Sequence, residues 1–172
     1  MSVREKADQI RQSPPAGRPL DAFDRKILGV LAADADASYA ELGQMVGLSA
    51  PAVHDRVKKL RASGALRRTV ALLDGAAIGR PLLAFVHVDN AGWCKTEELM
   101  AIADLPEVEE IHSVTGDTGM LLKVRCASGL ALEALLARLY AAPGVRSTRS
   151  YVVLSTYLER TAQAGITDFP EG

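Results

Sequence analysis

Apolar residues in the first half of the chain recur at spacings of three and four, which is the pattern of helices that bury one face. The pattern predicts helices over residues 21–33, over residues 39–46 and between Ser49 and Gly64. A tight Gly-Leu-Ser turn joins the last two. Two short amphipathic helices joined in this way are typical of a helix-turn-helix, in which one helix is buried and the other lies in a groove of DNA.

Residues that begin and end helices stand where this interpretation requires them. Ser38 precedes the second helix and Glu41 follows three residues later, which is the capping-box spacing. Gly47 ends the same helix, because a left-handed conformation costs glycine little. Ser49 caps the third helix, and Pro51 lies in its first turn, where a missing N–H is tolerated.

The third predicted helix separates apolar from charged positions. Val53, Val57 and Leu60 form a stripe for burial, and the opposite side carries polar and basic residues. A basic face that is only solvated is the alternative interpretation, but the capped helix and the glycine turn before it favour DNA. We expect the N-terminal half of the helix near base edges and Lys58 and Lys59 on phosphates, with Arg56 in either role. The candidate DNA-binding residues are Ser49, Pro51, Ala52, His54, Asp55, Arg56, Lys58, Lys59 and Arg61.

The pattern changes after Asp74, where short runs rich in apolar, β-branched and aromatic residues predict strands. Strands and helices follow in the order β-α-β-β-α-β, which is the ferredoxin-like arrangement. Two helices cover one face of such a sheet and the other face is bare, so we expect this half of the chain to form oligomers. The predicted strands span residues 81–88, 108–114, 120–126 and 150–158 (SYVVLSTYL), and the predicted helices span residues 93–105 and 130–141.

We therefore predict an α+β protein, with an N-terminal winged helix-turn-helix followed by a ferredoxin-like βαββαβ domain. The extended run RTVALL, which starts at Arg68, is predicted as the wing or hinge after the third helix. The first residues are predicted as a disordered arm, with a basic arm that touches DNA as the alternative. The predicted parts are an arm (1–19), a DNA-binding domain (20–69), a linker or hinge strand (70–80), a ligand-sensing and oligomerisation domain (81–160) and a tail (161–172).

Charge is distributed unevenly along a chain whose net charge is -1. Residues 21–73 carry 8 cations and 6 anions, whereas residues 74–172 carry 8 cations and 13 anions. A basic patch on a nearly neutral protein is expected of a specific DNA binder, and the acidic second half would repel phosphate. This asymmetry favours double-stranded DNA as the partner of the first half alone.

Cysteine usage and hydropathy predict the compartment. Two cysteines, Cys94 and Cys126, suggest no disulfide framework and fit a reducing cytoplasm. The sequence has no apolar run near the ~20 residues needed to cross a bilayer and no secretion signal at its start. We expect a cytoplasmic protein without a membrane partner.

No residues form a coherent catalytic or metal-binding set. His54, His87 and His112 lack metal-ligand spacing, and no serine lies in a GxSxG context. We therefore predict no enzyme activity, no cofactor and no metal. The Thr-Gly-Asp-Thr-Gly segment lacks the spacing and lysine of a P-loop, which predicts a hairpin turn. Its glycine N–H groups suit a carboxylate and Asp117 suits an ammonium, which together match a zwitterion.

Three segments of the chain resemble the Lrp/AsnC (feast/famine) family of transcription regulators. They are LDAFDRKILGVLAADADASYAELGQMVGLSAPAVHDRVKKLRASGAL from Leu20, SVTGDTGMLLKV from Ser113 and GVRSTRSYVVL from Gly144. The resemblance implies a winged helix-turn-helix, a ligand-sensing RAM domain, and dimers that often assemble into octamers. It also implies an effector, mostly an amino acid, bound near the glycine-aspartate turn. That turn comprises Val114, Thr115, Gly116, Asp117, Thr118 and Gly119.

One departure from the family pattern keeps alternatives open. The family usually has an aspartate two residues after Asp117, preceded by an aromatic residue, and this chain has Thr118 and Gly119 there. An architectural DNA-compacting protein without an effector is one alternative. An enzyme that resembles tetrapyrrole decarboxylases of the same two-domain layout is another.

Overall fold

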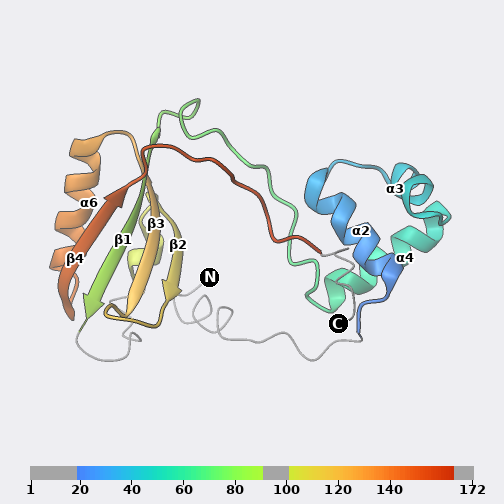
Figure 1. Ribbon diagram of the computed structural model, residues 1–172, viewed down its shortest axis with the longest axis horizontal. Helices are drawn as coiled ribbons and strands as arrows, with labels where there is room; N and C mark the ends of the chain where they lie inside the picture. Colours follow the sequence, from blue (N-terminus) through green and yellow to red (C-terminus); the bar gives the residue numbers. More distant parts are fainter. Residues whose placement is uncertain (1–18, 91–100, 165–172) are drawn as a thin grey trace. The chain divides into compact units, whose positions relative to one another are not determined.

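A computed structural model of the chain describes residues 19–90 and 101–164 of the 172. These residues form two compact units (Figure 1), which we call the head (residues 19–71 and 158–164) and the sheet domain (residues 72–90 and 101–157). The predictions for the N-terminal arm, for Cys94, for most of the helix at 93–105 and for most of the C-terminal tail lie outside the described residues.

The head contains the three predicted helices. They are α2 (Ala22–Ala33), α3 (Tyr39–Val46) and α4 (Ala50–Ala62). The Ser38 hydroxyl accepts the Glu41 N–H at 3.3 Å while the Glu41 carboxylate accepts the Ser38 N–H at 2.8 Å, which confirms the capping box. Gly47 adopts a φ of 76°, which confirms the left-handed turn between α3 and α4. The head's core consists of Ile27, Leu42, Val46, Val53, Val57 and Leu60.

The sheet domain has the predicted ferredoxin-like topology. Its four strands are antiparallel and lie in the order β2-β3-β1-β4. Of the helix predicted at 93–105, only the short 3-10 helix η1 (Ala101–Asp104) falls within the described residues. The elements are β1 (Leu82–Asn90), β2 (Val108–Ser113), β3 (Met120–Cys126), α6 (Gly129–Ala141) and β4 (Val145–Val152).

The two faces of the sheet differ sharply. Figure 1 shows α6 against one face, where Ala84, Val86 and Val88 of β1 are buried with every second residue of β3. Cys126 belongs to this core, and its burial raises the pKa of the thiol. The other face, which we call the open face, carries Phe85 of β1 between its register partners Lys123 and Tyr151. No described element packs on the open face as α6 packs on the first.

The last strand lies earlier in the sequence than predicted. Instead of residues 150–158 it spans Val145–Val152, because its partner β1 begins at Leu82. The Val153 N–H donates to the Leu83 carbonyl at 2.9 Å, and beyond it no strand remains to pair. The prediction followed the apolar run SYVVLSTYL, yet Leu154 and Tyr157 are 93% and 97% exposed.

The predicted wing or hinge strand is also absent from the described residues. Residues 67–74 contain neither helix nor strand, and residues 75–79 form a turn. Val70, Leu72 and Leu73 are 64%, 78% and 62% exposed. High strand propensity does not form a strand where no neighbouring strand offers hydrogen bonds.

None of the helices in the described ranges is long and apolar enough to cross a bilayer.

Two helical glycines provide a test of the helix-turn-helix geometry. A Cβ on Gly43 would lie 2.5 Å from the Leu48 carbonyl oxygen in the turn, whereas a Cβ on Gly29 would meet nothing within 4 Å. We expect Gly43→Ala to lower the free energy of unfolding by about 1–3 kcal/mol through steric strain. Gly29→Ala should raise it by roughly 0.5–1 kcal/mol, because alanine loses less backbone entropy. Urea unfolding followed by far-UV circular dichroism measures both, and two stabilising substitutions would contradict this packing of α3 on the turn.

Candidate nucleic-acid interface and effector turn

Helix α4 presents one face to the head's core and the opposite face to solvent. Val53, Val57 and Leu60 are 0%, 1% and 3% exposed, as the apolar stripe predicted. The Ser49 hydroxyl caps the helix by accepting the Ala52 N–H at 3.4 Å, and Pro51 lies exposed in the first turn. The helix therefore holds its N-terminal turn and its solvent face in the open, as an element that enters a groove must.

Arg56 takes a different place from the other cations of α4. Its Nη1 atom donates to Asp21 Oδ2 and to Asp24 Oδ1, both at 2.7 Å. Asp24 is only 1% exposed, and the guanidinium carbon lies 5.4 Å from the centroid of the Phe23 ring. The hydrogen bond to Asp21, followed by that to Asp24, raises the pKa of Arg56 further above its ordinary value. Arg56 thus joins α4 to the start of α2, and its position does not support the expected DNA contact.

The acidic partners of Arg56 also cap α2. The Asp21 carboxylate accepts the Asp24 N–H at 2.8 Å, and the Asp24 carboxylate accepts the Asp21 N–H at 3.2 Å. This is a capping box with aspartate in both positions. The Asp-x-x-Asp spacing at the start of α2 is the sequence signal for this capping box. It does not reveal that Arg56, 32 residues after Asp24, binds the same carboxylates.

The remaining basic residues of α4 have no acidic partner in the part of the chain that the structure describes. Within residues 19–90 and 101–164, no carboxylate pairs with Lys58, Lys59 or Arg61, and all three are exposed. Their positive charge is therefore available to an external anion. A polyanion such as a DNA duplex would bind such a surface with release of counterions.

His54 and Asp55 lie exposed near the N-terminal end of α4. His54 Nδ1 is 3.5 Å from Asp55 Oδ1, and the His54 ring meets the Tyr39 ring edge-on with centroids 5.4 Å apart. The contact with Tyr39 ties the first turns of α4 to the start of α3. The carboxylate of Asp55 is left 73% exposed on the solvent side of the helix.

The glycine-aspartate turn connects β2 and β3 as a hairpin, as predicted. Gly116 adopts a φ of 125°, which favours glycine. The Val114 N–H donates to the Gly119 carbonyl at 3.3 Å and closes the turn. Thr115 and Gly116 are exposed, so backbone groups at the tip face solvent.

Two side chains of the turn have partners that sequence reasoning missed. Asp117 Oδ2 accepts a hydrogen bond from Arg149 Nη2 of β4 at 2.9 Å, which lowers the pKa of the Asp117 carboxyl. Thr118 is buried, and its hydroxyl lies 3.0 Å from the Val88 carbonyl and 3.3 Å from the Met120 carbonyl. Thr118 therefore secures the end of the sheet, which argues against its expected role in holding an effector. Asp117 and Arg149 are 75% and 57% exposed and remain accessible.

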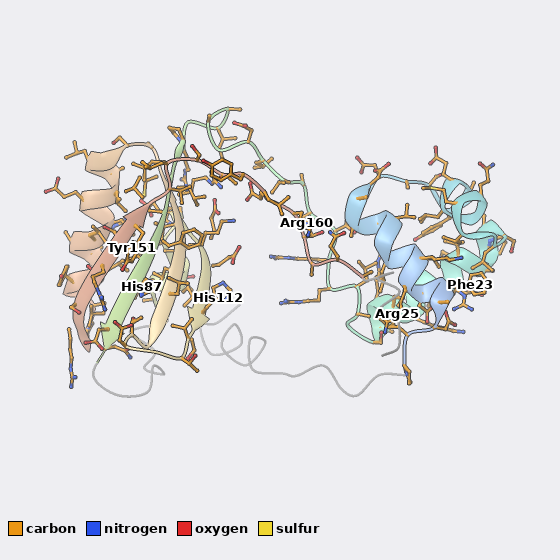
Figure 2. The ribbon with its side chains drawn as sticks, in the orientation of Figure 1. Phe23, Arg25, His87, His112, Tyr151 and Arg160 are labelled. Atoms are coloured by element: carbon orange, nitrogen blue, oxygen red, sulfur yellow. The ribbon has the colours of Figure 1, made fainter. Side chains whose placement is uncertain are left out.

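Two of the three histidines, His87 and His112, lie on strands, and Figure 2 labels both. His87 of β1 pairs in register with Leu121 and Arg149 on the open face, and its ring centroid is 5.1 Å from that of Tyr151. His112 of β2 lies 2.8 Å from Glu110, and this hydrogen bond is the main cause that lowers the pKa of Glu110. Among the described residues no group of three or more histidine, cysteine or acidic side chains is placed to hold a metal ion.

Two family profiles match consecutive parts of the chain. The AsnC-type helix-turn-helix domain matches residues 20–61, and the Lrp/AsnC ligand binding domain matches residues 83–163. The HTH-type transcriptional regulator FL11 of Pyrococcus horikoshii is 34% identical over 143 residues, which are 83% of this chain and 95% of that protein. The leucine-responsive regulatory protein of Escherichia coli K12 is 38% identical over 142 residues, covering 80% of this chain and 87% of that protein.

Solved structures match over both parts as well. A feast or famine regulatory protein from Mycobacterium tuberculosis, complexed with L-methionine, has a TM-score of 0.78 and 35% identity over 84% of this chain and 99% of that chain. A complex of a transcriptional regulator with L-Met from Neisseria meningitidis has a TM-score of 0.77 and 28% identity over 83% and 95%.

The ion pairs of Arg56 generate a prediction about stability. Arg56→Ala removes a cation that donates to the buried Asp24 carboxylate, and we expect the free energy of unfolding to fall by about 1–3 kcal/mol. Lys59→Ala on the exposed side of the same helix should change it by less than about 0.5 kcal/mol. Urea unfolding of both variants measures the difference. Equal midpoints for Arg56→Ala and the unaltered protein would show that the pair contributes nothing to the head.

Proposed function

The chain belongs to the Lrp/AsnC family of transcriptional regulators, and we propose that it binds operator DNA through the solvent face of α4 and adjusts this binding to an amino acid. One observation carries the DNA part of the proposal. Arg56 is bound to two carboxylates at the start of α2, while Lys58, Lys59 and Arg61 are exposed and pair with no described acid. One cation of α4 therefore stabilises the head, and we propose that the other three contact phosphate.

The proposed contacts divide by position along α4. Recognition helices bring their N-terminal residues to base edges in the major groove, so Ala52, His54 and Asp55 are assigned to base contacts, with Ser49 and Pro51 at the entrance. Lys58 and Lys59 follow one to two turns later and contact phosphates, which set the register of the protein on the duplex but carry no sequence information. Arg61 extends this basic edge, and Arg56 is left out.

The effector site is proposed at the glycine-aspartate turn. Two relatives are described as complexes with L-methionine, which supports an α-amino acid as the ligand class. Asp117 would accept the α-ammonium in place of the Arg149 guanidinium, and exposed turn amides would bind the α-carboxylate. The exchange is inexpensive, because an exposed ion pair contributes only about 0–1 kcal/mol. Thr118, whose hydroxyl is engaged with the sheet, takes no part.

The open face supports assembly of the chain with further copies. Phe85 and Tyr151 are 36% and 52% exposed at its centre, and Leu121 lies beside them in register with His87. The same face also carries Lys123, His87 and Arg149. Its apolar centre, which no described element covers, would be stabilised by a partner layer. We propose a homodimer that buries the open faces and assembles further to an octamer, with an effector altering DNA affinity by favouring one arrangement of the heads.

An architectural protein without an effector is the second candidate. The chain lacks the family's usual aspartate and aromatic residue after Asp117, and Arg149 already occupies the carboxylate that remains. Such a protein would compact DNA with little preference for sequence. Comparing binding to DNA upstream of its own gene with binding to random DNA, at one stated salt concentration, separates the two candidates.

The phosphate role of the lysines is tested by Lys58→Ala/Lys59→Ala. We expect the slope of log affinity against log salt to flatten by about 2 for each bound head, since each lost phosphate contact removes about 0.9. Operator and random DNA should be affected alike. Arg146→Ala, which removes an exposed cation of the sheet domain, is the control. Fluorescence anisotropy titrations at several salt concentrations give the slopes, and an unchanged slope for the double variant would refute the assignment of α4.

The effector proposal predicts thermal stabilisation by at least one amino acid. A ligand at 100 times its dissociation constant stabilises by about 2.7 kcal/mol, which thermal shift detects readily. Arg149 lowers the pKa of Asp117 in the free turn, and the α-ammonium would take its place in the complex, so the carboxylate is ionised in both and the shift should persist from pH 8 to pH 6. Asp117→Ala should abolish the shift, while Glu133→Ala on the exposed side of α6 should retain it. No shift with any amino acid at millimolar concentration would favour the architectural candidate.

The assembly proposal predicts that Phe85→Asp weakens the dimer, because it removes the largest apolar side chain of β1 from the contact and requires a carboxylate to be desolvated there. Sedimentation velocity should find a dimer or larger species for the unaltered chain and a smaller one for the variant. A monomeric unaltered chain would contradict the proposal.

A further inference from the structure

We propose that Arg67 and Arg68, in the segment directly after α4, form a second DNA-contacting element that binds the sugar-phosphate backbone beside the groove occupied by α4. The inference rests on the proposed DNA binding and goes beyond the recognition helix. It gives a role to a segment that the sequence pattern assigned to a wing, a structure that the described residues do not contain.

The chain is anchored immediately before these arginines. Gly64 adopts a φ of 77° and turns the chain back at the end of α4, with its N–H donating to the Arg61 carbonyl at 3.1 Å. The Leu66 N–H then donates to the Leu60 carbonyl at 3.0 Å, and the Leu66 side chain packs against the head's core. Arg67 therefore starts from a position fixed to the C-terminal end of α4.

The charge of this region is uncompensated. The sequence contains no acidic residue between Asp55 and Asp74, but it contains Lys58, Lys59, Arg61, Arg67 and Arg68. Arg67 and Arg68 are exposed, and no carboxylate within the described part of the chain pairs with either. Concentrated charge of one sign costs self-repulsion, and a polyanion relieves it.

Three arginines of the sheet domain behave differently. Arg125, Arg138 and Arg149 each donate to a carboxylate within 3 Å, at Glu109, Glu107 and Asp117. Exposed Arg146 has no such partner among the described residues and serves as the comparison. Arg61, Arg67 and Arg68, which also lack one there, follow one another closely at the end of the helix that we assign to DNA.

The position of Arg67 and Arg68 after the C-terminal end of α4 favours contact with phosphate over contact with base edges. When the N-terminal part of a recognition helix reads base edges, its C-terminal end emerges beside the sugar-phosphate backbone. Arg67 and Arg68 follow that end, and residues 67–74 adopt no helix or strand that would hold them away from the duplex. The planar guanidinium binds phosphate oxygens in a bidentate manner, which suits a backbone clamp.

The test compares Arg67→Ala/Arg68→Ala with Arg67→Lys/Arg68→Lys in the full chain, using operator and random duplexes over 50–200 mM salt. The alanine variant should flatten the salt slope by about 2 for each head, so that its affinity falls about tenfold less over this range than that of the unaltered protein. Its preference for operator over random DNA should be retained. The lysine variant should keep the slope, because it keeps both charges. Arg146→Ala is the control for charge loss elsewhere, and equal melting temperatures show that the exposed substitutions leave the fold intact.

The outcomes separate this inference from the proposed function. If Lys58→Ala/Lys59→Ala flattens the slope and the arginine variant does not, the segment is no DNA contact and the role of α4 stands. If the unaltered protein binds no DNA, both proposals fall. A change in the preferred bases, or a change of oligomeric state in sedimentation velocity, would instead assign the arginines to base recognition or to contacts with a second copy, and would overturn the inference.

Discussion

The ion pairs between Arg56 and the two aspartates at the start of α2 determine which face of α4, the proposed recognition helix, the head presents to solvent. Asp24 is buried, and Arg56 on the inner edge of α4 supplies a cation to its carboxylate. Together with the stripe of Val53, Val57 and Leu60, this contact fixes the rotation of α4 about its axis. With α4 in that rotation, Lys58, Lys59 and Arg61 lie on its solvent side.

The sheet domain depends on a comparable division between two faces. Alternation along β1 and β3 sends one set of side chains into the core with α6 and the other set to the open face. The glycine-aspartate turn lies at the end of this sheet, and Asp117 reaches from the turn to Arg149 on β4. A ligand that displaced Arg149 would therefore act on a strand whose side chains line the proposed contact between copies. This arrangement would give the proposed effector a physical route to the proposed contact between copies.

Local signals in the sequence predicted local structure well. Ser38, Glu41 and Gly47 determine the ends of α3 through contacts within a few residues, and the helix bounds follow from them. The topology of the sheet followed from the order of strands and helices. The predictions failed where distant partners decide: β4 ends where its antiparallel partner β1 begins, and the apolar run after Arg68 forms no strand because nothing in the described part of the chain pairs with it.

The candidate sites show the same limit. The basic character of α4 could be predicted from the sequence. The ion pair that takes Arg56 out of the proposed DNA surface joins it to Asp24, 32 residues earlier, and depends on how α2 packs against α4. Likewise, nothing near Thr118 in the sequence indicates that its hydroxyl meets the Val88 carbonyl, and nothing near Asp117 indicates Arg149.

The central claim is that the solvent face of α4 reads bases, and selection of bound duplexes from a random-sequence pool tests it most directly. Asp55 lies on that face, and Asp55→Asn replaces a carboxylate that accepts from cytosine with an amide that pairs with adenine. The account predicts that one position in each half-site changes its preference from cytosine to adenine while the other positions keep theirs. Identical preferences for both proteins, or no enriched sequence for either, would contradict it.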